Sequence, residues 1–375
     1  MADNTSSIDI LQAINNLSVY NITKNLIQIP ILDILIYEDL FYINNNYVII
    51  TLQETDEKVV PDIGDILFFY LDPNRFYSPF GEIEKNIKTE TINNTDIKYL
   101  LIHLIVEDIE YEVDKSSGVK EGCKIKLSYA CDFRYPNRQF SLSRSTKFNN
   151  VIEELNKQYN IELVVLDTYN NINISPVTIR QTDNLKYTIE HINCYETINN
   201  TDFRYCPIYS IFGFIWISLY NLISVSTKDL KSYIEENKII KIDDEYLVSE
   251  NIIKKKLYVK NMEFENKLSS IDKNDDTISI KLLEKENENL FNICHISTYG
   301  LTNRYLYQVI QDRLLSNTLT LKIEGEDKYN LRVGTKVILK NKIYLVISSI
   351  TKITTTGYFT TKSVLSYLEK YENNV

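Results

Sequence analysis

The stretch LRVGTKVILKNKIYLVISSI, residues 331–350, carries the clearest structural pattern in the chain. Val337–Leu339 is a run of strand-forming residues, Lys340–Lys342 interrupts it, and alternating apolar residues follow from Ile343 to Ile347. Strand-forming runs with a period of two, separated by a short polar break, are typical of a β-hairpin. The stretch therefore predicts two antiparallel strands near the end of the chain.

The composition extends this expectation to the whole chain. With 375 residues the protein has room for about two to four domains with sizeable cores. The hydrophobic share of 44% and the charged share of 25% are those of an ordinary globular protein. Tyr, Ile, Val and Thr are abundant, and all four favour strands. We therefore expect a β-rich chain.

The negative charge is concentrated at the N-terminal end. Residues 1–100 contain 15 acidic and 6 basic side chains, so they carry a net charge of −9 out of −10 for the chain. Binding to duplex DNA depends on Lys and Arg side chains that neutralise phosphates. Sequence-specific DNA binding is therefore not expected, whereas a surface past which DNA slides is compatible with this charge.

Neither a secretory signal nor a disulfide framework is predicted. The start MADNTSSIDILQAI lacks a basic segment followed by an apolar one. The number of cysteines is odd and no CxxC motif occurs, so free thiols in a reducing compartment are expected. The five are Cys123, Cys131, Cys194, Cys206 and Cys294.

One uncharged segment has the length of a short membrane span. Residues 206–223 lack charge over 18 positions, which is the lower limit for a spanning helix. The segment also contains Pro207, Gly213 and several polar residues. We interpret it as two buried strands, Ile208–Ile211 and Phe214–Leu219, and expect no stable membrane insertion.

Strand patterns dominate both ends of the chain, and a mixed pattern lies between them. Near the N-terminus, strands are predicted within 29–54 with a turn at Asn44–Asn46, and at 66–71, 98–107 and 124–129. In residues 148–159 apolar residues follow helical spacing after a Ser145 cap, 163–167 reads as a strand, and a second helix is expected around 185–194. Residues 140–226 are therefore predicted to form an inserted α/β unit.

Histidines and cysteines do not form a predicted active site. His103 lies within an apolar strand pattern, which favours a core or interface residue over a ligand. Cys294 and His295 are adjacent, so their side chains would point to opposite faces of a strand and would not form a catalytic pair. Trp216 could serve a sugar-binding module if it were exposed.

The carboxylates also lack the spacing of a catalytic or metal-binding motif. Glu107, Asp108, Glu110 and Glu112 lack the spacing and glycine of a calcium loop, so a solvated strand edge is favoured. The same holds for Glu38–Asp39. No phosphate-binding, nucleophile-elbow or zinc-protease motif occurs. We predict no catalytic, cofactor-binding or metal-binding residues, no cofactor and no enzyme activity; the alternative is a polysaccharide-degrading enzyme with dispersed carboxylates.

The C-terminal segment from residue 315 to 367 resembles the closing barrel of bacteriophage baseplate hub proteins of the late-control-protein-D type. In that family a Leu…Gly-x-x-Val strand precedes a hairpin that ends in Ile-Thr, and a Gly-Tyr-x-Thr-Thr turn follows. The matching residues are Leu331, Gly334, Val337, Ile350, Thr351, Gly357, Tyr358, Thr360 and Thr361. Ile36–Asp39, the helix and strand at 148–167, Leu185–Cys194 and the aromatic hairpin at 209–223 are similar to further family segments in the same order.

The resemblance implies a β-rich α+β fold with two tube-like β-barrels and an inserted α/β domain. The implied protein is a structural hub in the virion tail baseplate, made in the host bacterial cytoplasm. It would form a homotrimeric, pseudo-sixfold ring that joins the tail tube or tube-initiator proteins to a central spike protein. DNA would pass through its lumen without specific binding. A sugar-binding virion module is a further alternative.

The expected domain layout combines the strand patterns with this resemblance. It comprises 1–85 as the first β-barrel, 86–139 as the start of the second, 140–226 as the inserted α/β domain, 227–294 as a connecting segment, and 295–375 as the C-terminal part of the barrel region. In the final hairpin we expect Leu345, Ile347 and Phe359 on one apolar side. Lys340, Lys342 and Lys352 are expected at turns or rims, and the lumen is expected to be neutral or negative.

Overall fold

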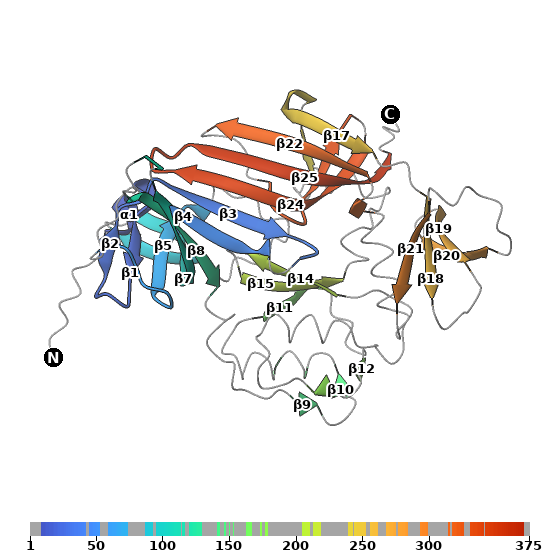
Figure 1. Cartoon of the computed structure of the whole chain (residues 1–375), viewed down its shortest axis with the longest axis horizontal. Coiled ribbons are helices and arrows are strands. Elements are labelled where there is room, and N and C mark those ends of the chain that lie inside the picture. The colour runs from blue at the N-terminus through green and yellow to red at the C-terminus, as the bar shows by residue number, and fades with distance from the viewer. Residues whose placement is uncertain are drawn as a thin grey trace.

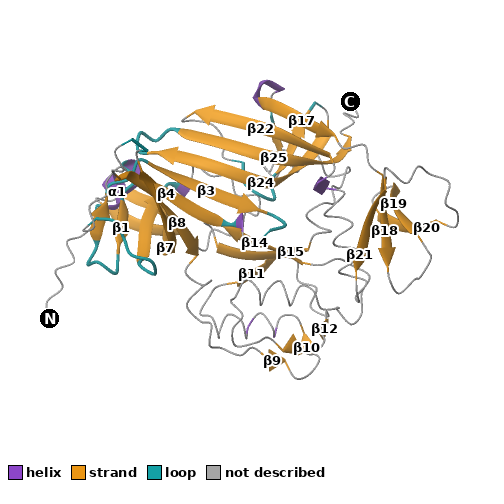
Figure 2. Ribbon diagram, viewed as in Figure 1, coloured by secondary structure: helices purple, strands orange, loops and turns teal. Residues whose placement is uncertain are grey.

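Strands that pair mostly antiparallel dominate the computed structural model of the chain (Figures 1 and 2). The structure describes residues 9–42, 45–52, 59–73, 87–92, 95–113, 115–116, 120–129, 141–142, 146–147, 150, 153, 163–166, 173–174, 177–178, 205–210, 213–218, 239–242, 244–252, 256–261, 268–274, 277–283, 293–298, 314–315, 317–325, 331–340 and 342–370. The expectation of a β-rich chain is confirmed.

Among the described residues of the N-terminal third lie one short helix and eight strands. They are α1 (Ile10–Asn15), β1 (Val19–Asn21), β2 (Ile27–Ile29), β3 (Asp33–Asp39), β4 (Tyr47–Leu52), β5 (Ile66–Leu71), β6 (Ile87–Ile92), β7 (Thr95–Val113) and β8 (Lys120–Tyr129). The strands predicted at 29–54, 66–71, 98–107 and 124–129 are confirmed as β3, β4, β5, β7 and β8. The sequence pattern does not signal β1 and β2, because three residues are too few to establish a period.

The C-terminal strands include the stretch at 331–350. The elements are β16 (Ile239–Lys241), the 3-10 turn η4 (Asp244–Tyr246), β17 (Leu247–Ile252), β22 (Asn317–Gly325), β23 (Lys336–Leu339), β24 (Lys342–Thr354) and β25 (Phe359–Lys370). β23 and β24 form the predicted hairpin, with Val337 opposite Tyr344. Lys340 makes the turn with a φ of 49°, a left-handed conformation that short β-turns require.

A single 14-stranded sheet joins the two ends of the chain (Figure 1). Its main path runs β17-β22-β25-β24-β3-β4-β8-β7-β5-β1-β2, with β16, β23 and β6 attached beside it. β3 from the N-terminal third pairs antiparallel with β24 from the C-terminal end. The range 86–139, expected to begin a second barrel, contributes β7 and β8, which pair with β5 and β4 of the range 1–85. The domain boundaries remain a prediction.

The alternation of buried and partly exposed side chains along β3 and β4 explains the composition of the N-terminal core. β3 and β4 bury every second residue, so Ile34, Ile36, Val48 and Ile50 point to one side of the sheet. β5 is buried on both sides because α1 covers its other face, where Ile10 and Ala13 pack with Phe68, Tyr70 and Tyr99. α1 begins at Asp9, whose side chain accepts a hydrogen bond of 3.1 Å from the backbone N–H of Gln12.

β24 is buried on both faces over Ile343–Ile347, and a β-bulge changes its register there. Leu345, Ile347 and Phe359 are all buried, as expected, but they do not share one side. Phe359 lies on the same face of β25 as Leu365, which is opposite Val346, whereas Leu345 is opposite Ser366. The expectation is wrong because the extra residue between Val346 and Ser348 shifts the alternation of β24 by one.

The lysine positions in the final hairpin are partly as expected. Lys340 and Lys342 are exposed at the turn between β23 and β24. Lys352 instead lies within β24, where its ammonium group is 2.8 Å from a carboxylate oxygen of Asp33. This lysine is therefore part of a strand face and not of a turn.

The middle of the chain contributes small separate sheets. Its elements are β9 (Ser141–Leu142), β10 (Thr146–Lys147), β11 (Leu163–Leu166), β12 (Asn173–Ile174), β13 (Val177–Thr178), β14 (Tyr205–Ser210) and β15 (Gly213–Ser218). β14 and β15 form the predicted antiparallel hairpin, and β11 pairs parallel to β15. In the part of the chain that the structure describes, no helix is long and apolar enough to cross a membrane. The helices predicted at 148–159 and 185–194 lie outside the described residues, so the α/β insertion remains a prediction.

Four described strands between residues 256 and 298 form one sheet. Its strands are β18 (Lys256–Asn261), β19 (Leu268–Asn274), β20 (Thr277–Leu283) and β21 (Ile293–Thr298). Their order is β20-β19-β18-β21, with β18 parallel to β21 and the other pairs antiparallel. The range 227–294, expected only as a connecting segment, therefore contains regular β structure.

Candidate functional site: the seam between the N-terminal and C-terminal strands

The seam is the antiparallel pair of β3 and β24, which closes the sheet between the two ends of the chain. Seven residue pairs are in register, from Asp33 opposite Thr354 to Asp39 opposite Ser348. One residue from the Asp39 end of the pair, Glu38 is directly opposite Ser349. Opposite residues of paired strands share a face, so the Glu38 carboxylate lies on the buried side of the sheet with Ser349.

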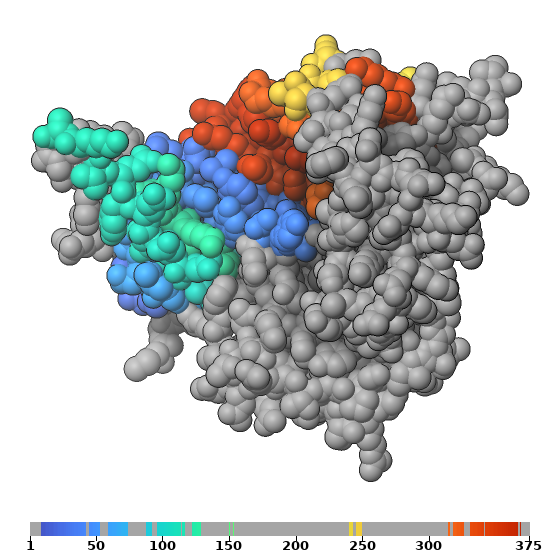
Figure 3. All heavy atoms as spheres, turned by 45° about the vertical axis from the view of Figure 1, so that its right-hand side comes forward, coloured from blue at the N-terminus to red at the C-terminus, as the bar shows by residue number. Residues whose placement is uncertain are grey.

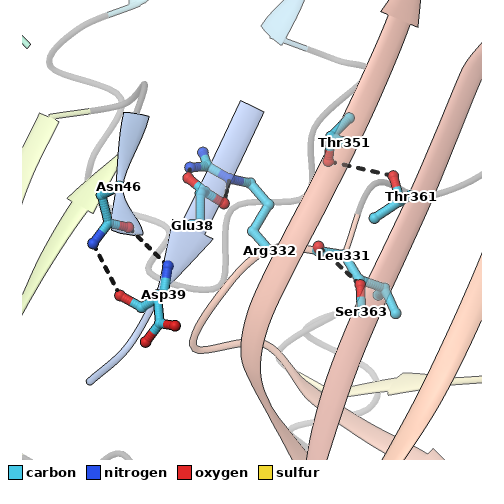
Figure 4. A network of polar contacts seen from close by, with 8 residues as sticks. All are labelled: Glu38, Asp39, Asn46, Leu331, Arg332, Thr351, Thr361 and Ser363. Atoms are coloured by element: carbon cyan, nitrogen blue, oxygen red, sulfur yellow. Dashed lines mark hydrogen bonds and ion pairs between the residues drawn. The ribbon is translucent and has the colours of Figure 1, made fainter. Parts of the chain in front are cut away.

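Glu38 forms a buried ion pair with Arg332 (Figure 4). Arg332 donates from Nε to Oε2 of Glu38 at 3.1 Å and from Nη2 to Oε1, so the contact is bidentate. The exposed fractions are 4% for Glu38 and 5% for Arg332. The buried pair has no net charge. Each charged group is stabilised by the other in place of the water that it loses on burial.

A tight turn at Leu331–Thr335 places Arg332 over the seam. Gly334 has a φ of 88°, a conformation that glycine adopts without steric cost. The turn closes through a hydrogen bond of 3.0 Å from Thr335 N to Arg332 O. It is held on β24 by two more, from Gly334 N to Val346 O at 2.9 Å and from Val346 N to Thr335 O at 2.8 Å. These bonds hold the backbone of the turn against β24, and the Arg332 side chain reaches from it to Glu38.

Hydroxyl groups line the buried side of the C-terminal strands next to this ion pair (Figure 4). The hydroxyls of Thr351 and Thr361 are 3.4 Å apart, and Ser363 donates to the carbonyl of Leu331 at 3.5 Å. Ser349 Oγ is buried and has no hydrogen-bond partner among the described residues. The buried side of the sheet is therefore polar around the Glu38–Arg332 pair, while Ile34, Ile36 and Ile353 make it apolar at the other end of the seam.

Asp39, the neighbour of Glu38, has a local structural role. Its Oδ1 accepts hydrogen bonds from the backbone N–H groups of Phe41 at 2.8 Å and Tyr42 at 2.9 Å. Asn46 accepts from the N–H of Asp39 at 2.8 Å and donates to its carbonyl at 3.1 Å. These bonds fix the β3–β4 turn, so Glu38 and Asp39 do not act as a pair of carboxylates.

This arrangement supports stability and not acid–base chemistry. The Glu38 carboxylate is occupied by Arg332, and within the described ranges no group of three or more metal-ligating side chains exists. In the sequence, Glu38 is a carboxylate that belongs to no recognisable site motif. Arg332 is not predicted from the sequence as a functional residue. The signal for their pairing is weak in the sequence, because 294 residues separate them.

The acidic cluster on β7 faces lysines on β8. Glu112 is 2.5 Å from Lys124, and Glu107 is 3.2 Å from Lys126. Asp108, Glu110 and Glu112 are exposed on one face, as the alternation of a strand requires. This geometry fits the interpretation of a solvated strand edge.

Among the remaining candidate residues, the structure describes the side chain of His103. His103 in β7 is exposed, so it is not a core residue, and its ring centroid lies 5.9 Å from that of Phe68. Desolvation against this surface, and then the charge of Lys88, lower the pKa of His103. Cys294 and His295 lie in β21 and Trp216 lies in β15, but their side chains are outside the described residues.

The fold was compared with those of known proteins. No protein-family model matches the sequence. No curated protein matches it either. Among solved structures, the chain is similar to the 43 kDa tail protein of prophage MuSo2 from Shewanella oneidensis, with a TM-score of 0.51, 10% identity, and coverage of 92% of this chain and 97% of that one. It is also similar to the tail protein from Neisseria meningitidis MC58, with a TM-score of 0.52, 11% identity, and coverage of 93% and 95%. The resemblance expected from the sequence is thus confirmed at the level of the fold.

Proposed function

We propose that the chain is a structural hub of a phage tail baseplate and resides in the virion. The observation that supports this most strongly is the likeness of fold to two tail proteins over more than nine-tenths of both chains in each pair. In this proposal three copies form a pseudo-sixfold ring of tube-like barrels. The ring joins the tail tube or its initiator proteins to a central spike, and DNA passes through the lumen.

The structure of the seam is suited to a sheet that bears mechanical force. A hub transmits force between tube and spike, so its sheet must not open between the N-terminal and C-terminal strands. The β3–β24 ladder together with the buried Glu38–Arg332 pair resists such opening, because separating the strands would break a bidentate contact between two buried charges. This role needs no reacting group, cofactor or metal.

The proposed lumen is neutral or negative. Most of the net charge lies in residues 1–100, which carry 15 acidic and 6 basic side chains. Two like charges ~10 Å apart repel by roughly 0.4 kcal/mol in water. Repeated over three copies, this repulsion would keep DNA from binding as it passes, whereas a basic lining would retain it through counterion release.

Measurement of the molar mass in solution tests the proposal. We expect sedimentation equilibrium of the full chain to give three times the chain mass of 43.9 kDa, with negative-stain images of a ring that has a central channel. The trimer is expected because each copy would supply two of six barrels. A species that stays monomeric across the concentration range, or a compact particle without a channel, would contradict the hub.

Limited proteolysis tests the proposed insertion of an α/β unit at 140–226. We expect first cuts near residues 138–145 and 224–230, because domain boundaries fall in segments that few contacts cross. The cut positions would be read by mass spectrometry of the fragments. Cuts concentrated within 148–195 would refute the insertion, since a folded unit protects its interior.

A further inference from the structure

Four buried hydroxyl groups on β24 and β25, here called the hydroxyl block, lie next to the Glu38–Arg332 pair (Figure 4). They come from two pairs of residues that are opposite each other across the strands: Ser349 with Ser363, and Thr351 with Thr361. The exposed fraction of each residue is 4% or less. On the other side of β24, Glu38 of β3 is opposite Ser349. Opposite residues of paired strands share a face, so the block and the Glu38 carboxylate lie on the same buried side.

Apolar side chains continue this face on the far side of the block. Ser363 is opposite Leu321 of β22, and Thr361 is opposite Ile323. Phe359 follows two residues before Thr361 on β25, and all three apolar residues are buried. Figure 3 shows the C-terminal strands, in red, directly against the N-terminal strands, in blue, so the seam is closed on that face. The block is therefore a polar island in the interior.

The hydrogen bonds of the block are long or missing. Ser349 Oγ has no hydrogen-bond partner among the described residues. The bond from Ser363 Oγ to the carbonyl of Leu331 is 3.5 Å long, and the hydroxyls of Thr351 and Thr361 are 3.4 Å apart. Hydrogen bonds between two oxygens are normally about 2.5–3.0 Å long. Because a buried hydroxyl without a partner destabilises the folded chain, a small polar group that bonds to Ser349 would stabilise the seam.

The two neighbours of Ser349 can both accept further hydrogen bonds. An ionised carboxylate accepts about four hydrogen bonds, and Arg332 supplies one to each oxygen of Glu38. Ser363 Oγ donates to Leu331, which leaves the lone pairs of this oxygen as acceptors. A water molecule accepts and donates at once, and buried waters typically make about three hydrogen bonds to groups of this kind. The surroundings of Ser349 therefore match the bonding pattern of a single water.

We propose that one ordered water molecule is bound beside Ser349. It accepts a hydrogen bond from Ser349 Oγ and donates to the Glu38 carboxylate and to Ser363 Oγ. The occupant is water and not a cation, because the Arg332 guanidinium already neutralises Glu38. The water extends the polar contacts of the ion pair across β24, so that β3 and β25 are linked through it. This site is independent of the proposed hub.

A crystal structure of the full chain, at a resolution that shows ordered water, tests the site directly. We expect electron density about 2.7–3.0 Å from Ser349 Oγ and from an oxygen of Glu38, which is the spacing of hydrogen bonds between oxygens. Distances of about 2.3–2.6 Å would mark a metal ion and would overturn the proposal. Lack of any density beside Ser349 would overturn it as well.

The substitution Ser349→Ala tests the same site in solution. If the hydroxyl binds a buried water, its removal should raise the unfolding equilibrium constant about fivefold, the effect of one lost hydrogen bond. Urea titration followed by circular dichroism measures this constant. An unchanged or smaller constant would show that the hydroxyl has no partner in the folded chain, and the water site would then be wrong.

Ser366→Ala is the matched control on β25. Ser366 is also buried, but its hydroxyl donates directly to the carbonyl of Leu314 at 2.7 Å. Its loss should raise the unfolding constant by a similar factor, because a water-mediated hydrogen bond is nearly as favourable as a direct one. In crystals, the density beside Ser349 should remain in Ser366→Ala and be lost or displaced in Ser349→Ala. Density that is unchanged in Ser349→Ala would show that the water does not depend on this hydroxyl and would refute the proposal.

Discussion

Replacement of Glu38 by alanine is expected to lower the free energy of unfolding by about 3–5 kcal/mol. The change leaves the Arg332 guanidinium buried without its carboxylate, and an uncompensated buried charge costs this much. Arg332→Ala should have an effect of similar size, because it leaves the Glu38 carboxylate in the same position. Urea titration followed by tyrosine fluorescence and circular dichroism measures the loss.

Two controls separate the buried charge from other effects. The double variant Glu38→Leu/Arg332→Met removes both charges and fills similar volume, so it should be much more stable than either single alanine variant. Glu112→Ala removes a carboxylate from the exposed pair with Lys124 and should cost no more than about 1 kcal/mol. If the free energy of unfolding of Glu38→Ala lies within about 1 kcal/mol of the wild-type value, the stability of the seam does not depend on this ion pair.

The substitution Ile347→Asp is expected to destabilise the chain by several kcal/mol, on the order of the cost of an unpaired buried charge. Ile347 is 3% exposed at the bulge of β24, and its carbonyl accepts a hydrogen bond of 2.9 Å from Leu40 N on the neighbouring chain segment. We expect the variant to be recovered as aggregate or as monomer with a lowered unfolding temperature. Size-exclusion chromatography and thermal unfolding provide the measurement.

Ile350→Asp is the matched control on the same strand. Ile350 is 36% exposed on the outer face, so an aspartate there keeps its water and should cost about 1 kcal/mol or less. A further variant, Ile347→Val, removes one methylene and should cost about 0.5–1.5 kcal/mol. Equal losses of unfolding free energy for Ile347→Asp and Ile350→Asp would show that burial at the bulge does not determine the destabilisation.

Much of the candidate site could not be foreseen from the sequence, for a physical reason. Glu38–Asp39 is visible as a pair of carboxylates, and its two members have unrelated roles: one neutralises Arg332 and the other fixes a turn. The role of each carboxylate depends on which groups of the folded chain lie next to it. In a strand, adjacent side chains point to opposite faces, so Glu38 meets the buried side and Asp39 meets the turn.

Short-range patterns in the sequence predict most of the longer strands in the large sheet. Period-two patterns predicted β3, β4, β5 and the hairpin of β23 and β24, and the uncharged segment at 206–223 was correctly interpreted as two strands, β14 and β15. These features depend on neighbours within a few residues, where alternation and turn residues act directly on the backbone.

The way in which distant segments combine becomes visible in the folded chain. The pairing of β3 with β24, the contact of Glu38 with Arg332 across 294 residues, and the bulge that separates Leu345 from Phe359 depend on strands that meet after folding. A one-residue shift of register moves every following side chain to the other face. Such a shift is set by the packing of both strands together, which neither strand encodes alone.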